Sequence, residues 1–126
     1  MQKPTPKPKM LHGNMSRPDE TREFPKGKVD IVKLGDTTFG RAVLQPGWSW
    51  AKCVKPLVQT SSCGEPHTQY VISGELMVVM DDGTRQKFGP GDVGVIPPGH
   101  DAYVVGNKPC EVIDFTGMTH YAVPKT

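Results

Sequence analysis

Apolar and polar residues alternate along this chain in short runs, which is typical of half-buried strands. Residues 29–34 and 38–44 predict two strands joined by a turn at Gly35-Asp36. Further strands are expected over 67–80, with a break at Ser73-Gly74, and over 84–88, 93–96, 102–105 and 112–115. No segment has a sustained apolar period of about 3.6 residues, so little helix is expected. About nine short strands with frequent turns predict an all-β antiparallel sandwich or barrel.

Glycine, proline and aspartate mark the ends of the predicted strands. Gln45-Pro46-Gly47 closes one strand, because proline presets a turn and glycine tolerates positive φ. Asp82-Gly83 lies between two β-prone runs and is a strong hairpin signal. The adjacent carboxylates Asp81 and Asp82 are therefore interpreted as turn residues rather than as a catalytic pair.

The first 16 residues differ from the rest of the chain. Pro4, Pro6 and Pro8 alternate with lysines, and such a segment favours extended, solvated backbone. Residues 1–16 are therefore predicted to form a flexible tail, or an arm that orders against a partner subunit. Residues 17–24 are charged and suit an edge strand. They are therefore assigned to the folded part of the chain, and residues 17–126 are expected to form a single domain.

Composition restricts the possible partners and the compartment. The 126 residues suit one domain, and Gly 14 and Pro 13 agree with many short elements joined by turns. A net charge of +2, with scattered lysines and arginines beyond residue 10, argues against nucleic-acid binding. No apolar run is long enough to span a bilayer, and the N-terminus lacks the apolar centre of a signal peptide, so a cytoplasmic location is expected. Three cysteines without CxxC spacing argue against a disulfide framework or a zinc ribbon.

Two stretches carry a resemblance to a known family. Residues 70–76, Tyr-Val-Ile-Ser-Gly-Glu-Leu, precede the 81–83 turn, and residues 88–92 and 95–99 read Phe-Gly-Pro-Gly-Asp and Val-Ile-Pro-Pro-Gly. They resemble the two conserved motifs of cupins, and the similarity extends over roughly residues 40–115. The resemblance implies a double-stranded β-helix, the conical jelly-roll barrel of this family. It also implies a homodimer formed by exchange of N-terminal strands, which the tail and residues 17–24 would suit.

The residues at the family's metal-ligand positions are different here. The cupin motifs supply three histidines and one glutamate, and alignment on Gly74 and Gly99 places those positions at four residues. They are Ser61, Cys63, His67 and Ala102. The resemblance therefore implies that the usual three-histidine, one-glutamate site is rewritten in this chain.

Cys63 and His67 are the candidate metal ligands that remain. If the cupin register holds, His67 and Gln69 point into the barrel, because residues two apart share a face of a strand. Thiolate and imidazole suit a divalent metal such as zinc or copper, with iron as a further candidate cofactor. A third donor is needed, and the candidates are His100, Gln69 and Glu65. The alternative is a polar pocket in which His67 hydrogen-bonds Gln69 or water.

Cys63 also admits a second chemical role. A nearby imidazolium lowers the pKa of a cysteine and makes its thiolate reactive, so a redox or nucleophilic thiol is one hypothesis. A buried, inert cysteine is the alternative. Cys53 and Cys110 have no neighbouring base in the sequence and are interpreted as packing residues, whereas His12 and His120 are expected to be exposed.

Aromatic residues and one histidine are candidates for the wall of a pocket. Trp48 and Trp50 are placed on one side of an extended segment, and either they line a pocket with Tyr103 or they fill the core. His100 follows the Pro97-Pro98-Gly99 turn, and either it is an acid or base at the pocket rim or it belongs to an exposed turn.

The sequence leaves two main candidate functions and one further possibility. The first is a non-catalytic or sensory protein that binds a small molecule in the barrel, through a set of pocket residues. That set is Ser61, Gln69, Trp48, Trp50, Tyr103 and His100. The second is a metal-dependent enzyme, namely an oxygenase, isomerase or lyase by resemblance to cupin enzymes, with Cys63 and His67 among its metal ligands. A third possibility is an interaction module whose barrel interior is filled by side chains. A fold alone does not decide among these.

Overall fold

A computed structural model describes residues 8–124 of the chain, and they form mainly β-strands. The strands are β1 Glu20–Phe24, β2 Gly27–Leu34, β3 Thr37–Leu44, β4 His67–Ser73, β5 Glu75–Met80, β6 Arg85–Phe88, β7 Val93–Ile96, β8 His100–Val105 and β9 Cys110–Asp114. Two short helices, α1 Trp50–Cys53 and α2 Lys55–Val58, are the helical elements of this part of the chain. The predicted all-β class with little helix is confirmed. None of the helices among residues 8–124 has the length and apolar character needed to cross a membrane.

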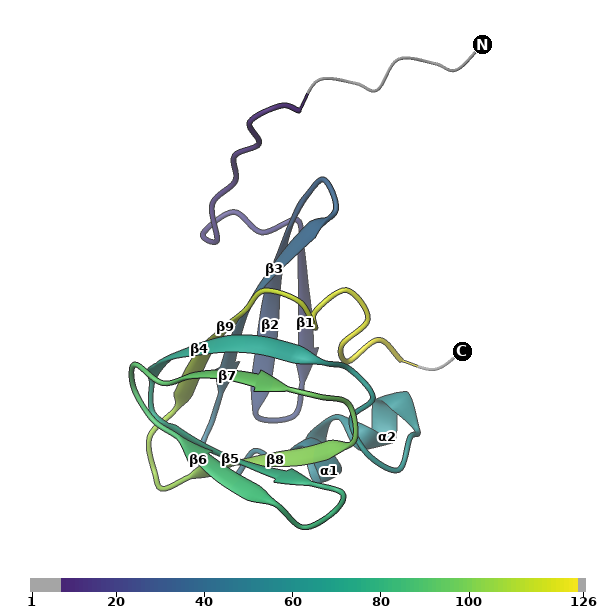
Figure 1. Cartoon of the computed structure of the whole chain (residues 1–126), viewed down its shortest axis with the longest axis vertical. Coiled ribbons are helices and arrows are strands. Elements are labelled where there is room, and N and C mark those ends of the chain that lie inside the picture. The colour runs from purple at the N-terminus through teal and green to yellow at the C-terminus, as the bar shows by residue number, and fades with distance from the viewer. Residues whose placement is uncertain (1–7, 125–126) are drawn as a thin grey trace.

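The strands form two antiparallel sheets that enclose an interior. The larger sheet has the order β1-β2-β3-β9-β4-β7, and the smaller sheet has the order β6-β5-β8. Figure 1 shows β4 and β7 across the molecule from β5, β6 and β8, with α1 and α2 beside β8. The segment 17–24 does supply an edge strand, as predicted, although that strand begins at Glu20. The predicted tail, residues 1–16, lies partly outside the described residues. Residues 8–14, which are described, contain no helix or strand.

Turn residues place the strand breaks where the sequence predicts them. The break between β4 and β5 falls at Gly74, which has φ +76°, and a Cβ there would lie 2.2 Å from the carbonyl oxygen of Pro109. Only glycine tolerates both the positive φ and this close approach. The hairpin between β5 and β6 turns at Asp81-Asp82-Gly83, and Asp82 Oδ1 accepts a hydrogen bond from the backbone N–H of Thr84 at 2.8 Å. Both carboxylates are thus turn residues.

Two local predictions are wrong. The segment after Trp48 is not extended, because Trp50 begins α1 and the Ser49 side chain caps that helix by accepting from the Lys52 N–H. His100 and Asp101 are not part of a turn, since they are the first residues of β8. In both cases pairing with the rest of the barrel outweighs the local signal: Ser49 bridges to Tyr103, and His100 pairs with Met80.

The core lies between the two sheets and is built from the inward-facing residues, which alternate with outward-facing residues along each strand. Val29, Val71 and Cys110 are fully buried, and Cys53 is also buried. All three cysteines are free thiols. The packing role expected for Cys53 and Cys110 agrees with their burial, and burial raises the pKa of Cys110 to about 11, which keeps it protonated.

Candidate metal centre

Three donor side chains converge at one end of the barrel interior. His67 begins β4, His100 begins β8, and Cys63 lies in the loop before β4. The loop is fixed to β8 by two backbone hydrogen bonds, from Cys63 N to His100 O and from Gly99 N to Cys63 O, each 2.8 Å long. All three side chains are buried, and one potential ligand atom from each lies within 4.8 Å of the others. Cys63 Sγ is 3.7 Å from His67 Nε2.

Both imidazole rings are held through their Nδ1 atoms. His67 Nδ1 lies 2.5 Å from Asp114 Oδ2, and His100 Nδ1 lies 2.8 Å from the carbonyl oxygen of Pro97. Asp114 is itself 1% exposed, and its Oδ1 accepts from the backbone N–H groups of Thr116 and Gly117. With Nδ1–H donated to an oxygen, each ring in its neutral form presents the Nε2 lone pair as a ligand.

The surrounding groups shift the pKa values of this cluster. Burial raises the pKa of Cys63, but hydrogen bonds with His100 and His67 outweigh it and bring the pKa of Cys63 down to about 7. Burial lowers the pKa of His67, but the hydrogen bond with Asp114 and the contact with Cys63 raise the pKa of His67 to about 9. A thiolate beside an imidazolium is therefore favoured between about pH 7 and pH 9 when no metal is present.

A cavity of about 40 Å³ adjoins the three donors. Gln69 and Trp48 are buried in its wall, and neither Gln69 Nε2 nor Trp48 Nε1 has a hydrogen-bond partner among the described residues. The lining residues are Ala42, Leu44, Trp48, Trp50, Cys63, His67, Gln69, Leu76, Val78, Ile96, His100, Ala102, Val112, Met118 and Tyr121. The wall is thus mainly apolar with a few polar groups, as in small-molecule sites.

The structure brings most of the predicted site residues together. His67, Gln69 and Val71 are all buried, which confirms the predicted inward register of β4. Trp48, Trp50 and His100 also line the cavity. The alternative interpretation, in which His100 belongs to an exposed turn, is wrong because that residue is 3% exposed.

Other predicted residues lie outside the cavity. Ser61 is exposed, and Tyr103 is 37% exposed. Of the candidate third donors, Glu65 lies outside both the cavity and the donor group, whereas His100 belongs to both. His12 and His120 are exposed, as expected.

Three residues of the site were missed by sequence reasoning: Asp114, Met118 and Tyr121. A signal existed for Asp114, since Cys110, Val112 and Asp114 share the inward face of β9. A carboxylate on that face needs a buried partner, and His67 is that partner. Met118 and Tyr121 lie in an irregular segment that has no period to read.

The C-terminal segment 117–122 closes the site from outside. The ring of Tyr121 packs against that of His67, with 5.6 Å between centroids. Gly117 makes this approach possible, because a Cβ there would lie 2.4 Å from His67 Nδ1. An outer cleft of about 310 Å³ lies next to the inner cavity, and three residues border both: Trp50, Cys63 and Tyr121. These residues therefore separate the inner cavity from the outer cleft.

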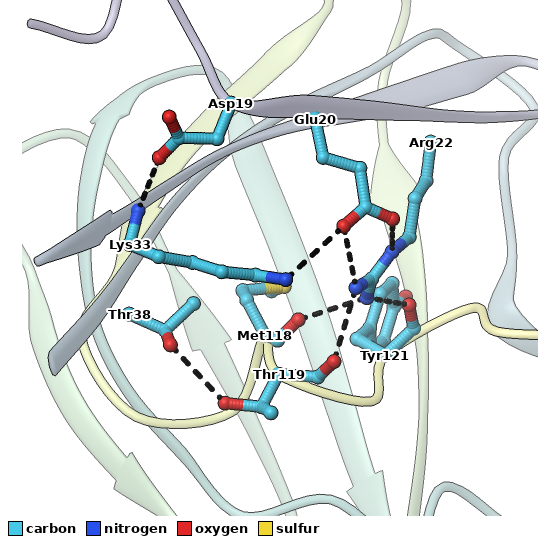
Figure 2. Close-up of polar contacts among 8 residues, drawn as sticks. All are labelled: Asp19, Glu20, Arg22, Lys33, Thr38, Met118, Thr119 and Tyr121. Atoms are coloured by element: carbon cyan, nitrogen blue, oxygen red, sulfur yellow. Dashed lines mark hydrogen bonds and ion pairs between the residues drawn. The ribbon is translucent and has the colours of Figure 1, made fainter. Parts of the chain in front are cut away.

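Arg22 of β1 fastens the segment 117–122 to the large sheet (Figure 2). Its guanidinium donates to the carbonyl oxygens of Met118 (2.9 Å), Tyr121 (2.7 Å) and Thr119 (3.0 Å). Glu20 pairs with the same guanidinium at 2.7 Å and also lies 3.5 Å from Lys33 Nζ. A planar group with several fixed donors suits this arrangement, which a lysine could not reproduce.

Replacement of Arg22 is expected to loosen the cover of the site. Arg22→Met should lower the free energy of unfolding by about 2–3 kcal/mol, because three carbonyl oxygens, two of them partly buried, lose a charged donor. Amide hydrogen exchange of residues 117–122 should accelerate most. Lys33→Met is the matched control, since it removes an exposed cation from the same Glu20 and should cost less than about 0.5 kcal/mol. Equal effects of the two variants in chemical denaturation would contradict this role of Arg22.

The fold matches several solved structures at low sequence identity. The polyketide cyclase RemF from Streptomyces resistomycificus is 18% identical, with 86% of this chain and 80% of that chain covered and a TM-score of 0.61. A protein of unknown function from Rhizobium leguminosarum is 20% identical, with coverage of 86% and 97% and a TM-score of 0.62. A cupin-like protein from Thermotoga maritima is 17% identical, with coverage of 77% and 73% and a TM-score of 0.54. The chain has the cupin fold. No family model and no curated protein matches the sequence.

Within this cupin fold, the donor group differs from the three-histidine, one-glutamate set. The sequence resemblance places Cys63 and His67 at two cupin ligand positions, and both residues belong to the donor group. Ala102, which the resemblance places at a third position, lines the cavity but offers no donor. His100, two residues earlier on the same strand and therefore on the same face, reaches the donor group instead.

Proposed function

We propose that this cupin binds a small molecule at a divalent transition metal held by Cys63, His67 and His100. The observation that carries the proposal is the convergence of three buried soft or borderline donors beside a cavity. Three protein ligands with an accessible fourth position are typical of reactive metal sites, whereas structural sites are closed by four. The metal would polarise a ligand oxygen at the fourth position.

The distances between the donor atoms and the orientation of the two histidines both suit such an ion. Tetrahedral zinc with ordinary Zn–S and Zn–N bonds places its sulfur and nitrogen ligands roughly 3.5 Å apart. The separation of 3.7 Å between Cys63 Sγ and His67 Nε2 is close to this value. The two Nδ1 partners, Asp114 and the Pro97 carbonyl, are the outer hydrogen bonds that orient metal-binding histidines.

The donor types favour zinc, with copper as the second candidate. One thiolate and two imidazoles are common zinc ligands, and iron sites usually include oxygen donors. Copper sites of the same donor set add a weak thioether ligand, and Met118 lines the same cavity. Zinc and copper should therefore compete for one site.

A thiol nucleophile is the second candidate function. Cys63, His67 and Asp114 form a chain of contacts, 3.7 Å and 2.5 Å long, in the order nucleophile, base and orienting carboxylate. The proximity of His100 to Cys63 distinguishes the two functions, because a thiol nucleophile does not need a second imidazole at that place.

Alkylation with iodoacetamide tests the proposal. In protein treated with a chelator, Cys63 should react at least about tenfold faster than Cys110, whose pKa is raised to about 11 by burial. One equivalent of zinc should protect Cys63, because the thiolate becomes a ligand. Mass mapping of the modified peptides gives both rates. Reaction of Cys63 that is independent of zinc, together with no bound zinc after dialysis, would contradict the metal proposal and favour the nucleophile.

A further inference from the structure

Two N–H donors in the cavity wall have no acceptor among residues 8–124. Trp48 is 3% exposed and Gln69 is 6% exposed, and both line the cavity. Trp48 Nε1 and Gln69 Nε2 are buried without a hydrogen-bond partner in this part of the chain. Both nitrogen atoms can only donate, and a buried donor without an acceptor is costly and rare. The cavity therefore lacks acceptor atoms that a bound molecule would supply.

The remaining cavity wall restricts the size and charge of that molecule. The apolar surface comes from Leu44, Leu76, Val78 and Val112, and no lysine or arginine of residues 8–124 lines the cavity. A buried water needs roughly 10–15 Å³ of such space, so about 40 Å³ accommodates roughly three water-sized groups. A carboxylate has three heavy atoms, is acceptor-only when ionised and carries the charge that complements a divalent cation.

We propose that the cavity binds the carboxylate group of a small organic acid, with its oxygens accepting from Trp48 Nε1 and Gln69 Nε2. This inference rests on the proposed function, because the same cavity contains Cys63, His67 and His100. An ammonium group is excluded as the occupant of this place, since it can only donate and would set donors against the two unpartnered donors. Gln69 lies two residues after His67 on the inward face of β4, so metal and carboxylate are recognised from one strand.

The inference is tested with acetate as the probe and nuclear magnetic resonance as the readout. ¹⁵N-labelled protein, both zinc-loaded and metal-free, is titrated with sodium acetate and separately with methylammonium chloride. The indole N–H signal of Trp48, assigned through Trp48→Phe, should shift downfield and saturate with acetate only. Gln69→Leu should weaken acetate binding about tenfold, because one donor to a charged group is lost. Gln86→Leu, at an exposed position of β6, should leave acetate binding unchanged.

The outcomes separate this inference from the proposed metal function. If zinc binds but acetate leaves the Trp48 signal unmoved in both forms, the cavity holds only water beside the metal and the carboxylate inference is overturned. An equal shift with methylammonium would also overturn it. If zinc does not bind but acetate moves the Trp48 signal in metal-free protein, the carboxylate site stands and the metal function fails.

Discussion

Cys63→Ala is expected to weaken zinc binding by more than about a hundredfold, so that the variant retains no zinc after dialysis. The thiolate is the only anionic donor of the three, and its loss leaves two imidazoles to hold the ion. Changes in outer hydrogen bonds alone commonly cost ten- to a hundredfold in metal affinity, so the loss of a ligand should exceed that range. Competition with a chromophoric chelator gives the affinity, and elemental analysis gives the zinc content per chain.

Cys53→Ala is the matched control for this variant. Cys53 is also a buried free thiol, and it lies outside the donor group and outside the cavity wall. Its zinc content should stay at one ion per chain. Wild-type affinity in Cys63→Ala, or equal losses in both variants, would show that Cys63 is not a ligand.

Asp114→Asn is expected to weaken zinc binding by about ten- to a hundredfold without unfolding the barrel. The amide oxygen can still accept from the N–H groups of Thr116 and Gly117. The amide nitrogen, however, donates toward His67 Nδ1, and this favours the tautomer whose proton is on Nε2, the atom that should bind the metal. The loss therefore acts through the tautomer of His67.

Asp101→Asn provides the comparison for Asp114→Asn. Asp101 lies next to His100 and also accepts backbone hydrogen bonds, from the N–H groups of Ala51 and Ala102. Unlike Asp114, it makes no hydrogen bond with the side chain of any of the three candidate metal ligands. Its zinc affinity should remain within about twofold of wild type, which calorimetric titration can resolve. If Asp114→Asn bound zinc as tightly as Asp101→Asn while both remained folded, the carboxylate would have no part in preparing His67.

Much of the barrel could be predicted because its breaks depend on local chemistry. Gly74 and the Asp82-Gly83 pair favour their turns whatever the distant chain does, and β4 to β7 accordingly follow the predicted ranges closely. Trp50 and His100 were misplaced because long-range pairing decides their conformation. Ser49 bridges to Tyr103 and His100 pairs with Met80, and neither partner is apparent from the local sequence.

The candidate site was only half accessible to sequence reasoning. Cys63 and His67 could be named because the family motifs place two ligand positions there. Asp114 and Tyr121 reach His67 only after β9 pairs with β4 and the C-terminal segment folds back over the sheet. Such contacts join residues roughly fifty positions apart, and no local period records them.

X-ray absorption at the zinc edge of the reconstituted protein tests the central claim most directly. The claim predicts one sulfur neighbour at about 2.3 Å, from Cys63, and two imidazole nitrogens at about 2.0–2.1 Å, from His67 and His100, with a further light atom in the fourth position. In Cys63→Ala the sulfur shell should disappear. A wild-type spectrum that contains only oxygen and nitrogen neighbours would contradict the account.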